Sequence, residues 1–517
     1  MAPERLNDFA LQLHPEDDVA VVRKAIRAGL PLMNGQGPFE AKSDIPLGHK
    51  IAVHAVAAGA PVRKYGQIIG FASTPIAAGE HVHAHNLGVK DFGRDYEFST
   101  DLKSFRPVAP EEERTFLGYR RPDGRVGTRN YVAVISSVNC SASVSNYVRD
   151  RFRTPQFRRD YPNVDGVIAF THKSGCNVQP GEPFQTLRRV HVGLARHPNI
   201  AGYVMIGLGC EGNQVEFLRK DYSLDQVKIG QPGPSFMTIQ QTGGVMKTVE
   251  RAVEAVSKIL PSADAARRTP EPVSRLILAE NCGGSDGYSG ITANPALGIA
   301  SDLLVRHGGT SVLAETPEIY GAEHLLTRRA VSREVGEKLL ALIRWWEDHA
   351  RRHDATIDNN PSWGNKQGGL TTIYEKSLGA VAKGGQAPLV EVYKYAEEIK
   401  ARGFCFMDTP GFDPVSMTGL VSGGATVGVF TTGRGSVYGC KPSPCIKVAT
   451  NTAIYQHMSD DMDINAGTVV DGTETLEEVG RRIFDKIVAV AGGEKTKSEL
   501  SGLGDEEFAP WILGPTF

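Results

Sequence analysis

The sequence predicts an α/β protein in which a small β-rich module precedes a larger body with largely parallel sheets. Short apolar runs separated by turns fill the first 90 or so residues, and from Phe116 onward strand-like runs alternate with helical ones. The later apolar runs lack a polar alternation, which is typical of parallel strands covered on both faces. A chain of 517 residues is long enough for two to four domains, and we expect three.

The N-terminal module is predicted to span residues 1–95. Its apolar runs are separated by the turn sequences PLGH, AAGAP and AAGE, and one helix is expected around Val19 to Ala28. Residues 96–114 are polar, show no clear period and predict a linker.

The body is predicted to form two α/β domains, residues 115–265 and 266–517, which meet near the polar and proline-bearing segment 261–272. Helices are expected around Met246 to Leu260 and over Val335 to Arg352. The expected strands are YVAVISSV, DGVIAFTH, GYVMIGLG, SRLILAE, TSVLAE and ATVGVFTTG.

Composition and charge exclude several classes of partner. A formal net charge of -2 and scattered arginines offer no basic face for nucleic acid. No signal peptide is recognisable and no stretch approaches a membrane-spanning apolar segment, so we expect a cytoplasmic protein with no membrane partner. A homodimer is expected only because it is the commonest assembly.

Four of the seven cysteines follow buried apolar runs: Cys140, Cys176, Cys210 and Cys282. Ligands bind at the carboxyl ends of strands in open α/β sheets, so we expect these four thiols to face one crevice and to bind a soft metal there. The alternative is four unrelated core cysteines. Cys405, Cys440 and Cys445 follow no such pattern and are assigned to structure. The odd number of cysteines and their wide spacing argue against a disulfide framework.

Other chemical groups accompany these cysteines. His172 and Lys173 share a loop with Cys176, and Glu211 follows Cys210 directly. Ser285 and Asp286 lie in the stretch NCGGSDGYSG, where glycines would let backbone amides approach an anion.

A second glycine-rich turn, FTTGRGS, presents Arg434, which is suited to a bidentate grip on a carboxylate. A solvated surface arginine is the alternative interpretation of this turn.

Over nearly its whole length the chain resembles the altronate dehydratase and galactarate dehydratase family of sugar-acid dehydratases. The matching stretches are GYRRPDGRVGTRNY, GLGCEGNQ, CGGSDGYSGITANPALG, DNNPSWGNKQGGLTTIYEKSLGA, FTTGRGSVYG and DMDINAG. HVHAHN, KYGQIIG and ETPEIYGAEHLL are more similar to the altronate branch, whereas HKSGCN and GCKPSPC depart from both branches.

The resemblance implies loss of water from a sugar acid to give a 2-keto-3-deoxy acid, with ferrous iron (Fe2+) as the metal. It also implies a β-clip domain of the SAF type for residues 1–95, and it places the family's cysteine motifs on the four strand-end cysteines. D-altronate is the first expected substrate and galactarate, or another 2-hydroxy acid, the alternative. A thiol or metal redox enzyme and a non-catalytic sugar-acid binding protein are alternatives from other classes.

For the chemistry of elimination, His172 is the first choice of general base, with Lys173 as a second choice and Glu211 and Asp286 as further catalytic candidates. Arg434, Lys366 and Ser285 are assigned to the substrate, and Lys366 is also a possible base. His83 and His85 alternate by two, so on a strand they would share a face and could contact the substrate or a metal. Whether the iron is mononuclear or part of a cluster stays open.

Overall fold

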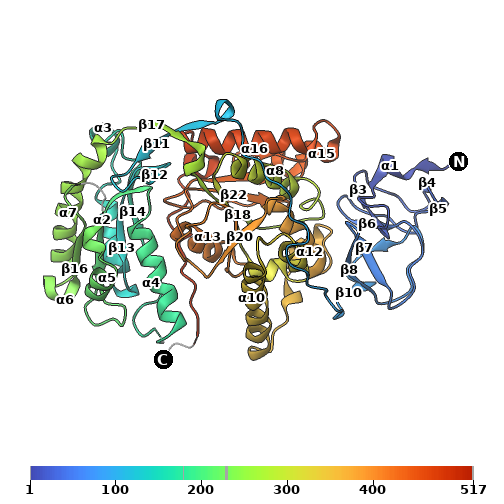
Figure 1. Cartoon of the computed structure of the whole chain (residues 1–517), viewed down its shortest axis with the longest axis horizontal. Helices are drawn as coiled ribbons and strands as arrows, with labels where there is room; N and C mark the ends of the chain where they lie inside the picture. The colour runs from blue at the N-terminus through green and yellow to red at the C-terminus, as the bar shows by residue number, and fades with distance from the viewer. Residues whose placement is uncertain (1, 179, 228–230, 515–517) are drawn as a thin grey trace.

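The protein is an α/β protein, as the sequence predicts, and it is described below in three consecutive parts. The computed structural model describes residues 2–178, 180–227 and 231–514. The N-terminal domain lies at one end of the molecule, the C-terminal part occupies the centre, and the second domain lies at the other end (Figure 1). In the described part of the chain, no helix is both long and apolar enough to cross a membrane.

The N-terminal domain is built from three small sheets, with strand orders β1-β4-β5, β10-β8-β7 and β2-β3-β6-β9. Its one helix among the described residues is the short α1 (Leu6–Phe9). Its strands are β1 (Glu4–Arg5), β2 (Ala10–Leu11), β3 (Val19–Val22), β4 (Pro31–Asn34), β5 (Gly37–Glu40), β6 (Lys50–Ala52), β7 (Pro61–Lys64), β8 (Gln67–Ala72), β9 (His81–Val82) and β10 (Leu87–Gly88).

The prediction of a helix around Val19 to Ala28 is wrong, because Val19–Val22 forms strand β3 instead. All four of its residues are buried, and it pairs antiparallel with β2 on one side and β6 on the other. Three β-branched valines favour this pleated and buried position over a helix.

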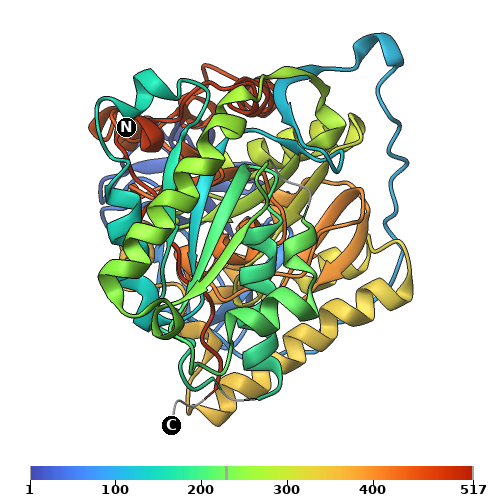
Figure 2. The ribbon, with the colours of Figure 1, turned by 90° about the vertical axis from the view of Figure 1, so that its left-hand side faces the viewer.

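Residues 96–114 run as an extended segment along the edge of the molecule (Figure 2), with one short 3-10 turn at Pro110–Glu112. At the start of this segment, Tyr96 donates a hydrogen bond of 2.6 Å to the buried Glu323. A three-stranded antiparallel sheet follows, in which β11 (Thr115–Arg120) pairs with β12 (Val126–Gly127) and with β17 (Thr269–Pro272).

The second domain has a four-stranded parallel sheet of order β14-β13-β15-β16. Its strands are β13 (Tyr131–Ser136), β14 (Gly166–Phe170), β15 (Ile200–Gly207) and β16 (Ser235–Thr238), and its helices are α2 (Ala142–Asp150), α3 (Phe157–Asp160), α4 (Glu182–Ala195), α5 (Val215–Asp221), α6 (Ile239–Thr242) and α7 (Val245–Ala265). Helix α7 continues through Pro261, so the polar segment between the domains begins later than the sequence suggested.

The C-terminal domain is organised around a seven-stranded parallel sheet of order β20-β21-β19-β18-β22-β23-β24. The strands are β18 (Ile277–Cys282), β19 (Thr310–Leu313), β20 (Leu389–Tyr393), β21 (Gly403–Met407), β22 (Val427–Thr432), β23 (Cys445–Ala449) and β24 (Ile464–Asn465). The helices are α8 (Ala293–Arg306), α9 (Glu323–Thr327), α10 (Arg333–Arg352), α11 (Trp363–Gln367), α12 (Ile373–Val381), α13 (Asp413–Ser422), α14 (Thr452–His457), α15 (Thr468–Asp471), α16 (Leu476–Ala491) and α17 (Lys497–Leu500).

The N-terminal domain shares a hydrophobic core with the C-terminal domain, in which Val62 and Ile69 belong to the same cluster as Ile319 and Leu378. The two backbones also approach closely. A Cβ atom at Gly287 would lie 1.9 Å from the carbonyl oxygen of Gly48, so only glycine fits at that position. The fold therefore fixes the position of the N-terminal strands over the loops that follow β18.

Candidate active site between the N-terminal and C-terminal domains

Three histidines of the N-terminal domain meet where it contacts the C-terminal domain. His49 lies just before β6, His81 begins β9, and His83 follows β9. One ring nitrogen from each lies within 4.8 Å of the others, and His49 Nδ1 is 3.0 Å from His81 Nε2. The other nitrogen of His49 is 3.2 Å from the carbonyl oxygen of Gln367, which ties the cluster to the C-terminal domain.

The local environment keeps these imidazoles neutral. Burial, reinforced by the neighbouring histidines, lowers the pKa of His81 to about 3. Burial and the charge of Lys50 lower the pKa of His83 to about 4, and burial also lowers the pKa of His49. A neutral imidazole has a free lone pair, which is the form that binds a metal or accepts a proton.

A buried charge network lies beside the histidines. The carboxylate of Glu375, in α12, forms ion pairs with Lys50 Nζ at 2.9 Å and with Lys64 Nζ at 3.0 Å. All three side chains are almost fully buried. Burial alone would raise the pKa of Glu375, but the two ammonium groups outweigh it and hold that pKa well below its ordinary value. The two lysines belong to the N-terminal domain and the glutamate to the C-terminal domain, so this network fixes the register of the interface.

His49 also lines a cleft of about 800 Å³ that contains two residues predicted from the sequence, Asp286 and Arg434. The Arg434 side chain is exposed and, in the described ranges, forms no ion pair or hydrogen bond. Its guanidinium is therefore available to a carboxylate that enters the cleft.

Asp286 has a different role in the same cleft. Its carboxylate accepts hydrogen bonds from Thr450 at 3.0 Å, from Asn451 at 3.1 Å and from the backbone of Tyr288 at 3.1 Å. Burial raises its pKa, and these bonds offset part of that rise. With its oxygens already engaged, Asp286 holds together the loops that form the cleft.

A second cluster lies under the same loop, at the carboxyl end of β18. The Cys282 sulfur is 3.7 Å from Glu315, 3.6 Å from Glu318 and 2.8 Å from the ammonium nitrogen of Lys383. Burial would lower the pKa of Lys383, but Cys282 and Glu315 raise it, so this lysine stays charged. Glu318 borders a further cavity of about 490 Å³.

The two clusters differ in their suitability for a metal ion. In the Cys282 cluster Lys383 already supplies a positive charge next to the thiol and Glu315, and a metal would have to displace it. The histidine cluster contains no such cation among its ligand atoms, and His83 Nδ1 is buried with no hydrogen-bond partner among the residues that the structure describes. Imidazole nitrogens also suit iron, so the histidine cluster fits a ferrous ion better.

The structure divides the four predicted metal cysteines between two sheets. Cys140, Cys176 and Cys210 follow β13, β14 and β15 of the second domain, while Cys282 ends β18 in the seven-stranded sheet. Backbone hydrogen bonds join the loops that carry the first three cysteines. Asn139 N–H donates to the carbonyl oxygen of Ser174, and Gly212 N–H donates to the carbonyl oxygen of Cys176. Three exposed thiols thus lie near one another, and the single crevice with all four sulfurs is not observed.

The second domain holds His172 in a way that does not suit a general base. Its Nε2 lies 3.1 Å from the carbonyl oxygen of Ser136 and from His191, and its Nδ1 accepts from the backbone of Ser174. Burial lowers its pKa to about 4. Both ring nitrogens are engaged, so His172 positions the strand-end loops.

The other second-domain candidates have different environments. The Glu211 carboxylate accepts bonds from Ser137 and from the backbone of Leu208 and Gly209. The Glu211 carboxylate therefore stabilises the loop that follows β15, in which it lies. Lys173 is exposed.

The remaining predicted residues lie around the candidate site. Ser285 is buried, and its hydroxyl has no hydrogen-bond partner. Lys366 is half-buried in α11. His83 and His85 do not share a strand, since β9 ends at Val82; His85 is exposed, and its ring centroid lies 5.6 Å from that of His81.

Sequence reasoning missed His49, His81, Glu315 and Lys383. The stretch HVHAHN did contain a signal for His81, because its first histidine extends the alternation on which His83 and His85 were chosen. His49 precedes a different strand, and Glu315 and Lys383 come from distant segments, so no local pattern indicated them.

Comparison with known proteins places the chain. The family model described as "D-galactarate/Altronate dehydratase, C-terminal" matches residues 273–516, that for the "second domain" of "D-galactarate dehydratase/Altronate hydrolase" matches 118–264, and the "Altronate/galactarate dehydratase SAF domain" matches 8–90. The chain belongs to the altronate and galactarate dehydratase family. The relatives that match almost the whole chain are named dehydratases, and the protein is accordingly a hydro-lyase with an N-terminal SAF domain.

Two relatives of the dehydratase family match over almost their full length. Altronate dehydratase of Bacillus subtilis is 35% identical over 497 residues, which cover 95% of this chain and 96% of the relative. Galactarate dehydratase (L-threo-forming) of Escherichia coli is 38% identical over 508 residues, 96% of each chain. These similar identities do not separate the two substrates.

A third similar protein matches this chain through two separate subunits. The beta subunit of (2R)-sulfolactate sulfo-lyase from Chromohalobacter salexigens is 32% identical over 400 residues, 76% of this chain and 96% of the subunit. Its alpha subunit is 37% identical over 91 residues, 16% of this chain and 95% of the subunit. The histidine cluster of the dehydratase described here lies at the contact between its SAF domain and its C-terminal domain.

Proposed function

We propose that this protein dehydrates a sugar acid, D-altronate in the first instance, to a 2-keto-3-deoxy acid in the cleft between its SAF and C-terminal domains. The observation that carries this proposal is a cluster of three neutral histidines, one of which, His49, lines the same cleft as an unpaired arginine. Elimination of water from a 2-hydroxy acid needs a carboxylate anchor, a proton acceptor and an electrophile for the leaving oxygen.

In this proposal, His49, His81 and His83 hold a ferrous ion. When bound, that ion supplies Lewis-acid stabilisation of the developing charge and of the departing hydroxide. The chain's own residues bind and orient the substrate. Arg434 takes the carboxylate, while Asp286 keeps the surrounding loops in place through its bonds to Thr450 and Asn451.

His85 is our choice for the general base at C2. It is exposed beside His81, and it forms no hydrogen bond or ion pair within the described ranges. An imidazole with a free ring nitrogen can accept a proton from a substrate carbon beside it, which suits His85 to this step.

One observation favours galactarate as a second candidate substrate. Arg23 also lines the cleft; its Nη2 donates to the carbonyl oxygen of Asn7, and its buried Nε has no hydrogen-bond partner in the described part of the chain. Galactarate carries a carboxylate at each end, so a second cation in the cleft would suit it, whereas altronate has only one carboxylate to bind.

The test is an anaerobic assay of 2-keto acid formation with Fe2+ and a panel of altronate, galactarate, galactonate and mannonate, without NAD. We expect altronate to give the largest kcat/KM. If Arg23 recognises a second carboxylate, Arg23→Ala lowers kcat/KM for galactarate and leaves that for altronate unchanged. No keto acid from any substrate in iron-loaded protein would contradict the proposal.

The thiols Cys140, Cys176 and Cys210 are the alternative iron site. Thiolates bound to one ion at about 2.3 Å would lie about 3.8 Å apart, but these three sulfurs are not among the described ligand groups that meet within 4.8 Å. Their wider spacing suits an iron–sulfur cluster better than a single ion. Acid-labile sulfide in active protein would support that alternative, and its absence would exclude the cluster.

A further inference from the structure

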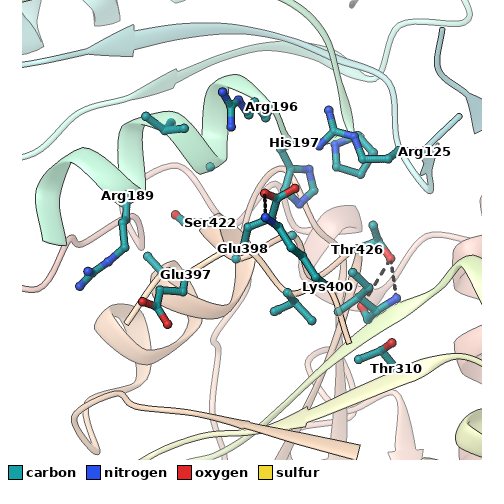
Figure 3. Close-up of a pocket in the computed structure, with 18 of the residues that line it drawn as sticks. Arg125, Arg189, Arg196, His197, Thr310, Glu397, Glu398, Lys400, Ser422 and Thr426 are labelled. Atoms are coloured by element: carbon teal, nitrogen blue, oxygen red, sulfur yellow. Dashed lines mark hydrogen bonds and ion pairs between the residues drawn. The ribbon is translucent and has the colours of Figure 1, made fainter. Parts of the chain in front are cut away.

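A cavity of about 300 Å³ lies between the second domain and the C-terminal domain (Figure 3). Ile277 and Thr310, the first residues of β18 and β19, form part of its wall. The candidate active site lies past the carboxyl end of β18, so this cavity is at the opposite end of the seven-stranded sheet. The chemistry proposed above does not use it.

Positive charge dominates the lining. Six cationic side chains and two carboxylates surround the cavity: Arg125, Arg189, Arg196, Arg275, Lys400 and Arg402, against Glu397 and Glu398. Three of these cations form ion pairs: Arg125 with Asp123, Arg189 with Glu182 and Lys400 with Glu398. Arg196, Arg275 and Arg402 have no carboxylate partner in the part of the chain that the structure describes.

The three unpaired arginines come from both domains. Arg196 caps helix α4 of the second domain and donates one bond of 2.7 Å to the carbonyl oxygen of Tyr222. Partial burial and the charge of Arg275 lower the pKa of Arg402, as expected for two like charges near each other; both arginines are exposed at the rim of the cavity. An anion between the domains would relieve the repulsion between them.

A buried polar atom also lacks a partner here. Ser422, at the end of α13, is 3% exposed, and its hydroxyl forms no hydrogen bond with any residue in the described ranges. It lines the cavity, where Figure 3 shows it between α4 and Glu397. An unsatisfied buried hydroxyl costs about 1–3 kcal/mol, which a bound acceptor or donor would offset.

Much of the remaining wall is apolar. Val192, Ile277 and Ile399 provide hydrocarbon surface. A Cβ at Gly193 would lie 1.9 Å from the carbonyl oxygen of Ser422, so the two domains are in direct backbone contact beside the cavity. The cavity is therefore formed before any ligand arrives.

We propose that this cavity binds a small organic anion with an apolar body, whose carboxylate or phosphate group is held by Arg196, Arg275 and Arg402. The ligand joins the second domain to the C-terminal domain and stabilises their contact by mass action. This site is separate from the dehydration site, and its occupancy does not require the sugar acid.

Isothermal titration calorimetry of the full-length protein tests this proposal with hexanoate, hexyl phosphate and the neutral analogue hexanol. We expect at least one of the two anions to bind with one site per chain and to raise the thermal midpoint, and hexanol to bind at least about tenfold more weakly. The head group of the tighter anion identifies the class of ligand. Absence of binding by both anions, or equal binding by hexanol, would overturn the proposal.

Matched variants locate the binding. Arg196→Ala and Arg402→Ala are each expected to weaken the anion about tenfold, since each removes one charged hydrogen-bond donor. Arg352→Ala, at the exposed end of α10, and Arg434→Ala, in the candidate active site, should leave it unchanged. Binding that is lost in Arg434→Ala and retained in Arg196→Ala and Arg402→Ala would place the anion in the active-site cleft and overturn the proposal.

Discussion

The two parallel sheets of this protein place different chemistry at the same topological position. In the second domain, β13, β14 and β15 are followed by three exposed cysteines. In the C-terminal domain, β18 ends in Cys282, which is buried with Glu315, Glu318 and Lys383 under a loop shared with the candidate active site. The comparison teaches that strand ends locate a site but do not decide its ligands.

The difference comes from what covers each sheet end. The SAF domain packs over the C-terminal loops and contributes His49, His81, Lys50 and Lys64 to that interface. The thiols of the second domain remain exposed to solvent. Desolvated groups interact more strongly with one another and with a ligand, which favours the covered end for catalysis.

The largest effect is expected from breaking the SAF interface at its charge network. Glu375→Gln leaves Lys50 and Lys64 buried without a counter-charge, so we expect a loss of about 3–5 kcal/mol in the free energy of unfolding. Chemical denaturation followed by circular dichroism measures it. Glu254→Gln, which removes an exposed ion pair with Lys258, is the control and should change stability little; an equal response of the two variants would contradict this role.

Next comes the histidine cluster, which distinguishes the two sheet ends directly. His81→Ala is expected to lower iron content and to reduce kcat by about a hundredfold or more. The exposed His14 belongs to the same domain, and His14→Ala is the control, which should keep the iron content and the kcat of the unmodified protein. Cys140→Ser should also retain iron and activity. If Cys140→Ser lost iron and activity and His81→Ala kept them, the iron site would be at the thiols.

Acid should weaken the second domain as well as the SAF interface, because the second domain contains the buried and neutral His172, His191 and His197. Burial lowers the pKa of His197 to about 3. The unfolded histidine, with a pKa near 6.5, takes up a proton first, so stability is lost as the pH falls from about 6.5 toward 3. At pH 5 the protonation of His197 in the unfolded chain lowers the free energy of unfolding by about 2 kcal/mol. Between pH 7 and pH 5, the free energy of unfolding should therefore fall less in His197→Gln than in the unmodified protein.

The smallest effect concerns the substrate anchor. Arg434→Ala is expected to raise KM about tenfold, because it removes a charged contact to the substrate carboxylate. Steady-state kinetics on the preferred sugar acid measures it. Arg434→Lys should recover part of the loss, since it keeps the charge without the bidentate geometry, and an unchanged KM in Arg434→Ala would remove this residue from the site.

Much of the fold could be predicted from local patterns. The unbroken apolar runs correctly indicated parallel strands at β13, β14, β15, β18, β19 and β22, and the glycine-rich turns correctly indicated loops at their ends. The expected helix at Val19 was wrong because its valines are buried between two partner strands, and pairing depends on residues far away in the chain.

The candidate site was only partly predictable for the same reason. His83, Asp286 and Arg434 each stand in a recognisable stretch, and the structure brings all three to the SAF interface or its cleft. Cys282 was grouped with the other three cysteines because periodicity shows where a strand ends but not which sheet it joins. Glu375 is one residue of an ordinary helix until Lys50 and Lys64 meet it across the interface.

The most direct test is anomalous diffraction at the iron absorption edge from crystals of active protein loaded anaerobically with Fe2+. The account predicts one peak between the rings of His49, His81 and His83. A peak beside Cys140, Cys176 and Cys210, with none at the histidines, would contradict it.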